Sequence, residues 1–89
     1  MLDLDYTTQM GRDLKLAKKR HKDLSKLQEV TDLLQKEEEL PDRFHNHKLS
    51  GNYKNHWECH IEPDWLLIYY YSGSTIILVR NGSHADLFS

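Results

Sequence analysis

The sequence predicts an α+β domain in the order β-α-α-β-β-β, with two N-terminal helices packed on one face of a mainly antiparallel sheet. Two observations lead to this prediction. Before residue 40, apolar residues recur at steps of three and four, which is the helical period. After Gly51 they alternate or form short continuous runs, which is typical of strands. Because 89 residues have room for one hydrophobic core, residues 1–89 are expected to form a single domain.

The chain is expected to begin with an edge strand and a helix. Leu2 and Leu4 alternate with acidic residues, which predicts the short strand. Thr7 or Thr8 then offers a side-chain oxygen to cap the helix. The apolar stripe of that helix consists of Met10, Leu14, Ala17, His21 and Leu24. Because His21 lies on this stripe, it is expected to be a packed structural histidine.

The helical spacing continues to about Glu38, which predicts either a helical hairpin or one long helix broken near residues 21–23. The helix must end before Pro41, because the residue ahead of a proline disfavours helical backbone. Residues 40–52 are rich in Pro, Asn, Ser and Gly and are expected to be a connecting loop.

Three strands are predicted after this loop. In the first, Trp57, Cys59 and Ile61 face the core and alternate with a solvent-facing set made of His56, Glu58, His60 and Glu62. The apolar run 65–71 suits a central strand buried on both faces, and residues 75–80 form the third strand. By this alternation Cys59 is a buried structural thiol rather than a nucleophile. Residues 83–89 follow as a short C-terminal piece.

Several classes of protein are excluded by what the sequence lacks. A single cysteine forms no intramolecular disulfide, and no stretch resembles a secretory signal, so a cytoplasmic protein is expected. The longest apolar run has seven residues, whereas a membrane-spanning helix needs about twenty, so no membrane span is expected. Neither a serine-hydrolase elbow nor a phosphate-cradling loop is present.

Charge is segregated along the chain although the net charge is only -2. Residues 12–26 contain seven basic and two acidic residues, and an acidic cluster follows at Glu37, Glu38, Glu39 and Asp42. The lysines of the basic segment are either the solvated face of a helix or a surface for nucleic acid. The candidates for phosphate contact are Lys15, Lys18, Lys19 and Lys22.

Five of the six histidines lie in the second half of the chain, which favours proton transfer or metal binding. Neither the pair His45 and His47 nor the pair His56 and His60 has a common zinc spacing, so no metal site is expected. His60 and Asp64 flank a turn, where the carboxylate either orients the imidazole or only forms the turn.

Two residues near the C-terminus have two interpretations each. Arg80 either clamps a phosphate or pairs with a carboxylate at a strand edge. Phe88 either stacks on a base or anchors the end of the chain.

Three segments occur in an order and at a spacing that resemble the YafQ branch of the RelE/ParE toxin superfamily. They are His47-Lys-Leu-Ser-Gly-Asn-Tyr53, His60-Ile-Glu-Pro-Asp-Trp-Leu-Leu-Ile-Tyr69 and Arg80-Asn-Gly-Ser-His-Ala-Asp-Leu-Phe88. The N-terminal segment 15–23 is similar as well, so the resemblance covers essentially the whole chain.

The resemblance implies a type II toxin that enters the ribosomal A site and cuts mRNA by attack of a ribose 2'-OH, with no cofactor and no metal. Its catalytic residues are expected at His47, His60, Asp64 and His84. His60 or His47, oriented by Asp64, is the expected base and His84 the expected acid. The family's arginine and phenylalanine fall on Arg80, which would stabilise the phosphate, and Phe88, which would hold a splayed base.

The implied partners are mRNA, the ribosome and a cognate antitoxin, with a heterotetramer expected for the toxin–antitoxin complex. The basic helices are expected to meet rRNA phosphates, and an acidic antitoxin arm is expected to run over them. Two alternatives on the same fold stay open. One is an RNase that cuts RNA without ribosomes, and the other is a ParE-like inhibitor of DNA gyrase.

Overall fold

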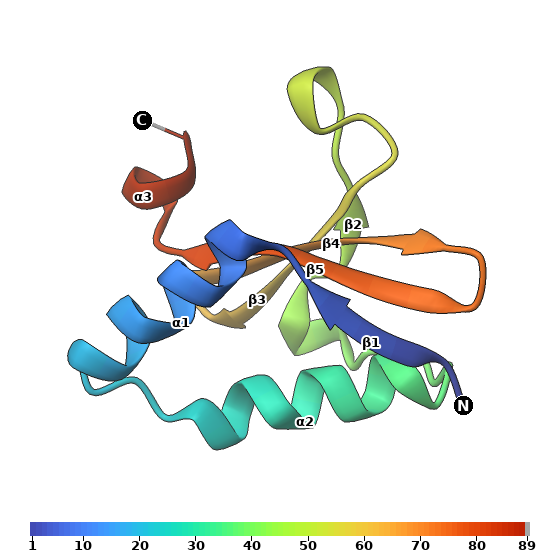
Figure 1. Ribbon diagram of the computed structural model, residues 1–89, viewed down its shortest axis with the longest axis horizontal. Helices are drawn as coiled ribbons and strands as arrows, with labels where there is room; N and C mark the ends of the chain where they lie inside the picture. Colours follow the sequence, from blue (N-terminus) through green and yellow to red (C-terminus); the bar gives the residue numbers. More distant parts are fainter. Residues whose placement is uncertain (89) are drawn as a thin grey trace.

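Five strands form one mixed sheet in the order β1-β5-β4-β3-β2 (Figure 1). The structure is a computed structural model, and it describes residues 1–88. The strands are β1 (Asp3–Tyr6), β2 (His47–Lys48), β3 (Trp57–Glu62), β4 (Trp65–Ser72) and β5 (Thr75–Gly82). The helices are α1 (Thr8–Lys19), α2 (Leu24–Gln35) and α3 (His84–Phe88). β1 pairs with β5 in parallel and the other pairs are antiparallel, so the predicted fold class and edge strand are confirmed.

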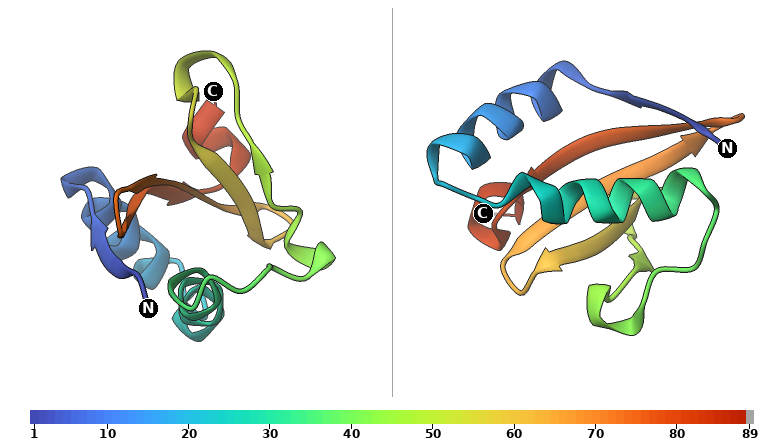
Figure 2. Two further views of the ribbon diagram at one scale, coloured as in Figure 1. Left: turned by 90° about the vertical axis from the view of Figure 1, so that its right-hand side faces the viewer. Right: turned by 90° about the horizontal axis from the view of Figure 1, so that it is seen from below.

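The sheet separates two apolar layers. Helices α1 and α2 cover one face, while α3 and the segment before β3 lie over the other (Figures 1 and 2). The larger core, under α1 and α2, includes Met10, Val30, Cys59, Trp65, Leu67, Tyr69 and Ile76. The smaller one, under α3, contains Leu66, Ile68 and Leu87. The even residues 66 and 68 therefore face α3, and the odd residues 65, 67 and 69 face the two long helices.

Strand β4 confirms the prediction of a central strand buried on both faces, because Trp65 to Tyr69 are at most 1% exposed. Cys59 is also completely buried, as expected for a structural thiol. Burial raises the pKa of this thiol to about 12, so it stays protonated and unreactive at neutral pH.

The N-terminal helices begin and break close to the predicted positions. The Thr7 hydroxyl accepts a hydrogen bond from the Met10 N–H at 3.0 Å and caps α1. The break takes the form of a Schellman cap, in which Lys22 N–H donates to Ala17 O at 3.0 Å. His21 occupies the left-handed position of this cap, with φ 62°, and its side chain is exposed. The prediction that His21 packs in the core was therefore wrong.

A second Schellman cap ends α2 at Gln35, three residues earlier than expected. Residues 40–52 are also more ordered than a plain loop. They contain the 3₁₀ turn η1 (Asp42–Phe44) and β2, and a second 3₁₀ turn, η2 (Gly51–Tyr53), begins at their end. β2 pairs only two residues with β3, which is too short for a period-two pattern to be detected in the sequence.

Helix α3 was not predicted, although its start carries a recognisable signal. Ser83 Oγ accepts a hydrogen bond from Asp86 N–H, and Asp86 Oδ2 accepts one from Ser83 N–H. This reciprocal pair is a capping box. None of the helices within residues 1–88 has the length and apolar character needed to cross a membrane.

Candidate active site

Four histidines meet on the sheet face that lies opposite α1 and α2. His60 projects from β3 on this face, since its neighbours Cys59 and Ile61 belong to the other core. Its ring centroid lies 5.3 Å from that of His45, 6.4 Å from His47 and 5.7 Å from His84. The sheet thus brings together the three histidines predicted as catalytic, from three separate segments of the chain.

The backbone fixes the orientation of His47. Its Nδ1 lies 2.7 Å from the carbonyl oxygen of His45 and donates to it, because a carbonyl only accepts. Nε2 therefore faces the other way, 3.4 Å from Oε1 of Glu58. His45 takes the left-handed conformation, with φ 47°, that turns its carbonyl toward this ring. The tautomer of His47 thus follows from local chain geometry.

Glu58 lies on the predicted face of β3 but is buried, which the sequence analysis did not expect. It was expected on the solvent side of its strand, but its side chain is only 7% exposed, because histidines cover it. Its Oε1 lies 3.4 Å from His47 Nε2 and 3.5 Å from His60 Nε2. One buried carboxylate thus lies within 3.5 Å of two imidazoles. The alternation placed Glu58 on the correct face but gave no information about what lies over it.

Asp64 pairs with His84 and not with His60, so the predicted partnership was wrong. Asp64 Oδ1 accepts from the His84 backbone N–H at 2.8 Å and from His84 Nδ1 at 2.5 Å. These bonds, the backbone one first, lower the pKa of Asp64 below its ordinary value. The carboxylate is therefore ionised at neutral pH and holds His84 with Nε2 directed away from Asp64. The pairing joins residues 20 positions apart, beyond the reach of local pattern.

Contacts of Asp86, in the first turn, hold the short helix α3, and with it His84, in place. Besides its capping box, Asp86 accepts a hydrogen bond at 2.6 Å from Nη1 of Arg20, which lies at the end of α1. This bond holds the pKa of Asp86 well below its usual range. Gly82 packs so closely on Asp86 that a Cβ there would lie 2.9 Å from its side chain. The beginning of α3 is thereby fixed to α1 and β5.

Arg80 is paired with a buried carboxylate that the sequence analysis did not single out. Its Nε and Nη2 donate to Asp13 of α1, both at 3.0 Å, which is a bidentate ion pair. Asp13 accepts further hydrogen bonds from Asn81 N–H at 3.2 Å and from Gln9 at 3.1 Å. The hydrogen bonds with Asp13 raise the pKa of Arg80, with a smaller contribution from Tyr53. The guanidinium keeps Nη1 outside the bidentate pair, so the two predicted roles of Arg80 are compatible.

Phe88 is partly a packing residue and partly exposed. Its ring lies edge-on to Tyr53 of η2, with 6.2 Å between centroids, and 48% of the residue is exposed. A cavity of about 620 Å³ is lined by both residues, together with Ser50, Asn52 and Leu87. The predicted alternatives, anchor and stacking surface, therefore apply to different sides of the same ring.

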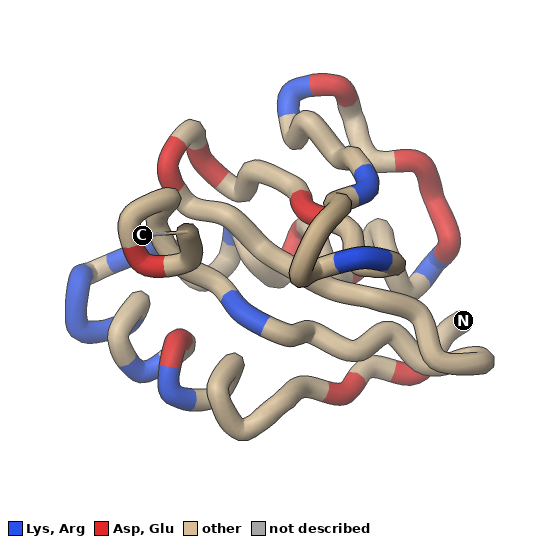
Figure 3. Tube along the Cα trace, turned by 90° about the horizontal axis from the view of Figure 1, so that it is seen from above, with Lys and Arg blue, Asp and Glu red and all other residues tan. Residues whose placement is uncertain are grey.

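The predicted phosphate-binding lysines separate into two groups. Lys15, Lys18 and Lys19 are exposed on α1, where Figure 3 shows positive charge along the side that carries this helix, far from the acidic run 37–39. Lys22 is half-buried, with Nζ 3.4 Å from Glu62 Oε1 and 5.7 Å from the Trp65 ring centre. Lys26 also pairs with Glu62, at 2.9 Å. The exposed group thus remains the better candidate for contact with a polyanion.

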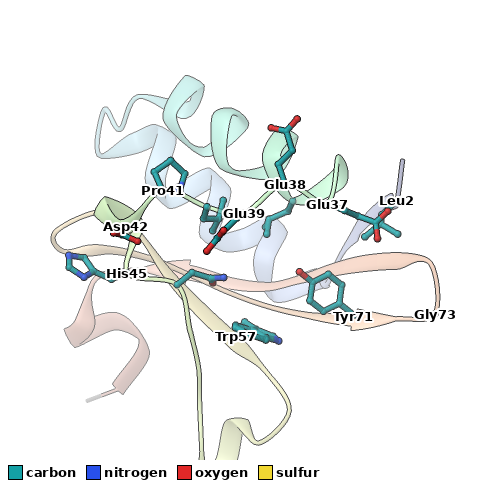
Figure 4. A pocket seen from close by; sticks show the side chains of 13 residues that line it. Leu2, Glu37, Glu38, Glu39, Pro41, Asp42, His45, Trp57, Tyr71 and Gly73 are labelled. Carbon is teal, nitrogen blue, oxygen red and sulfur yellow. The ribbon is translucent and has the colours of Figure 1, made fainter.

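Two large cavities lie on either side of His45. One, of about 740 Å³, is lined by His47, His60, Lys26, Arg43, Phe44 and neighbouring residues, so two catalytic candidates open onto it. The other, of about 730 Å³, has an acidic rim formed by Glu37, Glu38, Glu39 and Asp42 around Trp57 and Tyr71 (Figure 4). Only the first cavity combines imidazoles with basic side chains, which suits a phosphodiester substrate.

The arrangement suits acid and base catalysis on a polar substrate. Neutral and protonated imidazoles accept and donate protons near neutral pH, and Arg80 supplies a fixed positive charge. Within residues 1–88, no group of three or more His, Cys, Asp or Glu side chains is placed to hold a metal ion.

Comparisons with known proteins agree with this chemistry. A family model described as a bacterial toxin of type II toxin-antitoxin system, YafQ, matches residues 2–89. The mRNA interferase toxin YafQ of Escherichia coli strain K12 is 41% identical over 87 residues, which are 97% of this chain and 95% of the relative.

Solved structures give the same result. The crystal structure of the E. coli DinJ-YafQ complex matches with a TM-score of 0.91 and 39% identity, covering 100% of both chains. A metal-bound toxin from Helicobacter pylori matches with a TM-score of 0.93 and 38% identity, covering 99% of this chain and 100% of that one. The similarity therefore extends over the whole fold.

Proposed function

Because the chain belongs to the YafQ family of bacterial type II toxins, we propose that it is an mRNA interferase whose histidine face cleaves mRNA held in the ribosomal A site. The observation that carries this proposal is that the ring of His60 lies next to those of both His47 and His84. Glu58 lies beside His60, and Asp64 pairs with His84. Two proton-transfer groups on two sides of one phosphate are what RNA cleavage by 2'-OH attack requires.

The reaction proceeds by transfer of two protons. His60 or His47 accepts the proton of the ribose 2'-OH, whose oxygen forms a bond to the adjacent phosphorus. The bond from phosphorus to the 5' oxygen breaks, and His84 donates a proton to that oxygen. The products are a 2',3'-cyclic phosphate and a 5'-OH. The histidine cluster supplies both proton transfers and needs no cofactor.

Each carboxylate supports one of these steps. Glu58 lies against Nε2 of both candidate bases and stabilises the imidazolium formed when either accepts a proton. Asp64 holds Nδ1 of His84, so that its Nε2 is the proton donor toward the leaving oxygen. Arg80 stabilises the extra negative charge of the pentacoordinate phosphate, with its orientation set by Asp13.

The proposed cellular partners follow from the family. A cognate antitoxin, as DinJ is for YafQ in the solved complex, binds this chain and inhibits it, with a heterotetramer as the proposed assembly. An acidic arm of the antitoxin runs over the basic face of α1 and covers it. The toxin acts in the cytoplasm, where translating ribosomes are found.

Primer extension on mRNA in a translation reaction, with and without ribosomes, tests this function. Cleavage that requires ribosomes, and that stops when a 2'-deoxy nucleotide replaces the one at the cut, is the expected result. Cleavage of naked RNA at the same rate would instead support the ribosome-independent RNase. Intact mRNA together with inhibited DNA supercoiling would support the gyrase inhibitor.

Removing the exposed lysines of α1 should weaken ribosome binding without changing the chemistry. The triple variant Lys15→Ala/Lys18→Ala/Lys19→Ala is expected to raise the dissociation constant for ribosomes. It should also lower the slope of log K against log salt by about 1 for each phosphate that a lysine no longer neutralises. Binding measured across a salt series checks this, with Lys36→Ala, an exposed lysine beyond the end of α2, as the control. An unchanged slope would show that these lysines only solvate the helix.

A further inference from the structure

The aromatic residues around Phe88 form an arrangement that the proton-transfer chemistry does not use. Ring centroids lie 6.2 Å apart for Phe88 and Tyr53, 5.7 Å for Tyr53 and His56, and 4.9 Å for His56 and Tyr70. The four rings come from α3, from the segment between β2 and β3, and from β4. They form a continuous row that starts at the C-terminal end of α3.

The cavity at the start of this row has the composition of a nucleobase site. It is lined by Tyr53, Phe88, Leu87, Asn52 and Ser50, so two aromatic rings and an aliphatic side chain form its walls. The exposed side chains of Asn52 and Ser50 supply hydrogen-bond donors and acceptors for a base edge. No carboxylate lines this cavity within the described residues, so nothing there repels a phosphate backbone.

The position of the cavity relative to the catalytic groups fits a neighbouring nucleotide. His84 and Phe88 are four residues apart on α3, which places them on the same face, about 6 Å apart along the helix axis. Arg80 interacts electrostatically with Tyr53, so the proposed phosphate-stabilising charge lies beside the same aromatic wall. A base in the cavity therefore belongs to a nucleotide whose phosphate lies near His84.

We infer that the cavity lined by Tyr53 and Phe88 binds a nucleobase of the mRNA, that of the nucleotide next to the scissile phosphate. Tyr53 is then a specificity-determining residue, because the base must leave its stack with the neighbouring bases and enter this cavity. Stacking on an aromatic ring supplies much of the energy for holding a splayed base. This inference rests on the proposed function and adds to it the groups that hold the substrate.

The substitution Tyr53→Leu tests the inference, because leucine keeps the apolar packing under η2 but removes the flat ring. It should lower kcat/KM for cleavage of ribosome-bound mRNA by about 10- to 100-fold, as expected for the loss of one stacked base. Tyr53→Phe should restore most of the activity. Tyr6→Leu is the matched control, since Tyr6 is an exposed tyrosine of β1. Equal activity of the leucine and phenylalanine variants at position 53 would overturn the inference.

A binding measurement separates this inference from the proposed cleavage. Ribosomes carry an mRNA with 2-aminopurine at one position of the A-site codon, and the His84→Gln variant is added so that cutting is suppressed. Fluorescence quenching at one codon position, lost when Tyr53→Leu is added to this variant, is the expected result. Quenching that persists without Tyr53 would overturn the base site alone. Failure of the unaltered chain to cut mRNA would instead count against the proposed function.

Discussion

Replacing His84 by glutamine is expected to slow mRNA cleavage on ribosomes by about 10²- to 10⁴-fold, the usual contribution of a positioned acid or base. Glutamine keeps a hydrogen-bonding group near Asp64 but has no proton to give at neutral pH. The His84 side chain is 55% exposed, so the substitution removes little packing. Single-turnover cleavage at saturating enzyme measures the effect. His21→Gln, which changes an exposed histidine at the end of α1, should leave the rate unchanged.

The lowered pKa of Asp64 keeps its pairing with His84 independent of pH in the neutral range. Its pKa is lowered in the folded protein, so its contribution to stability is present above the ordinary value of 3.8 and is lost as pH falls below that value. The Asp64–His84 bond is therefore intact throughout the neutral range. Between about pH 5 and pH 8 the titration of Asp64 is therefore not expected to change the cleavage rate. Asp64→Asn should lower the single-turnover cleavage rate, because the carboxylate that holds the His84 ring is lost. An unchanged rate would contradict the assignment of His84 as the proton donor that Asp64 holds.

The fold was largely predictable because it depends on repeated local patterns. Three patterns identify the buried faces of helices and strands. They are the steps of three and four in the first half of the chain, the alternation in β3 and the apolar run of β4. These faces pack as expected. What escaped prediction was short. β2 has two residues and α3 has five, and neither is long enough to show a period. The cap that ends α1 escaped for another reason, because a left-handed position is normally signalled by glycine and here is filled by His21.

The candidate site was predictable as a set of residues but not as a set of partners. His60 and Asp64 are close in sequence, and the turn between them suggested a pair. In the structure the turn directs Asp64 toward the beginning of α3 instead, where it meets His84. Glu58 shares a strand face with His60, yet its burial depends on His47 of β2, a strand absent from the prediction. Which side chains meet across the sheet, or between the sheet and a helix, depends on the tertiary structure. Local patterns in a single sequence do not predict these partners.

The Asp13–Arg80 pair is the clearest example of partners that local sequence patterns do not predict, because it joins α1 to β5 across 67 residues. Asp13 is buried and accepts four hydrogen bonds, three of them from Arg80 and the Asn81 backbone. Removing one partner of such a pair leaves the charge of the other partner buried without an opposite charge beside it. Asp13→Ala is therefore expected to lower the free energy of unfolding by about 3 to 5 kcal/mol. Chemical denaturation measures this, with Asp32→Ala, an exposed aspartate of α2, expected to change stability by less than about 0.5 kcal/mol.

The same pair links stability to catalysis, and a double-variant cycle separates the two. If Asp13 and Arg80 stabilise each other, the double variant Asp13→Ala/Arg80→Ala should lose less free energy of unfolding than the two single variants lose in sum. The reason is that no unpaired charge remains in the double variant. The milder Asp13→Asn, assayed at a temperature where it is folded, should still lower the cleavage rate, since the guanidinium loses one of the two oxygens that orient it and the negative charge of the carboxylate. Strictly additive stabilities, or full activity of folded Asp13→Asn, would show that α1 has no part in positioning Arg80. The expected coupling means that the basic helix α1 presents lysines to the ribosome on one face and positions the proposed phosphate-stabilising arginine with the other.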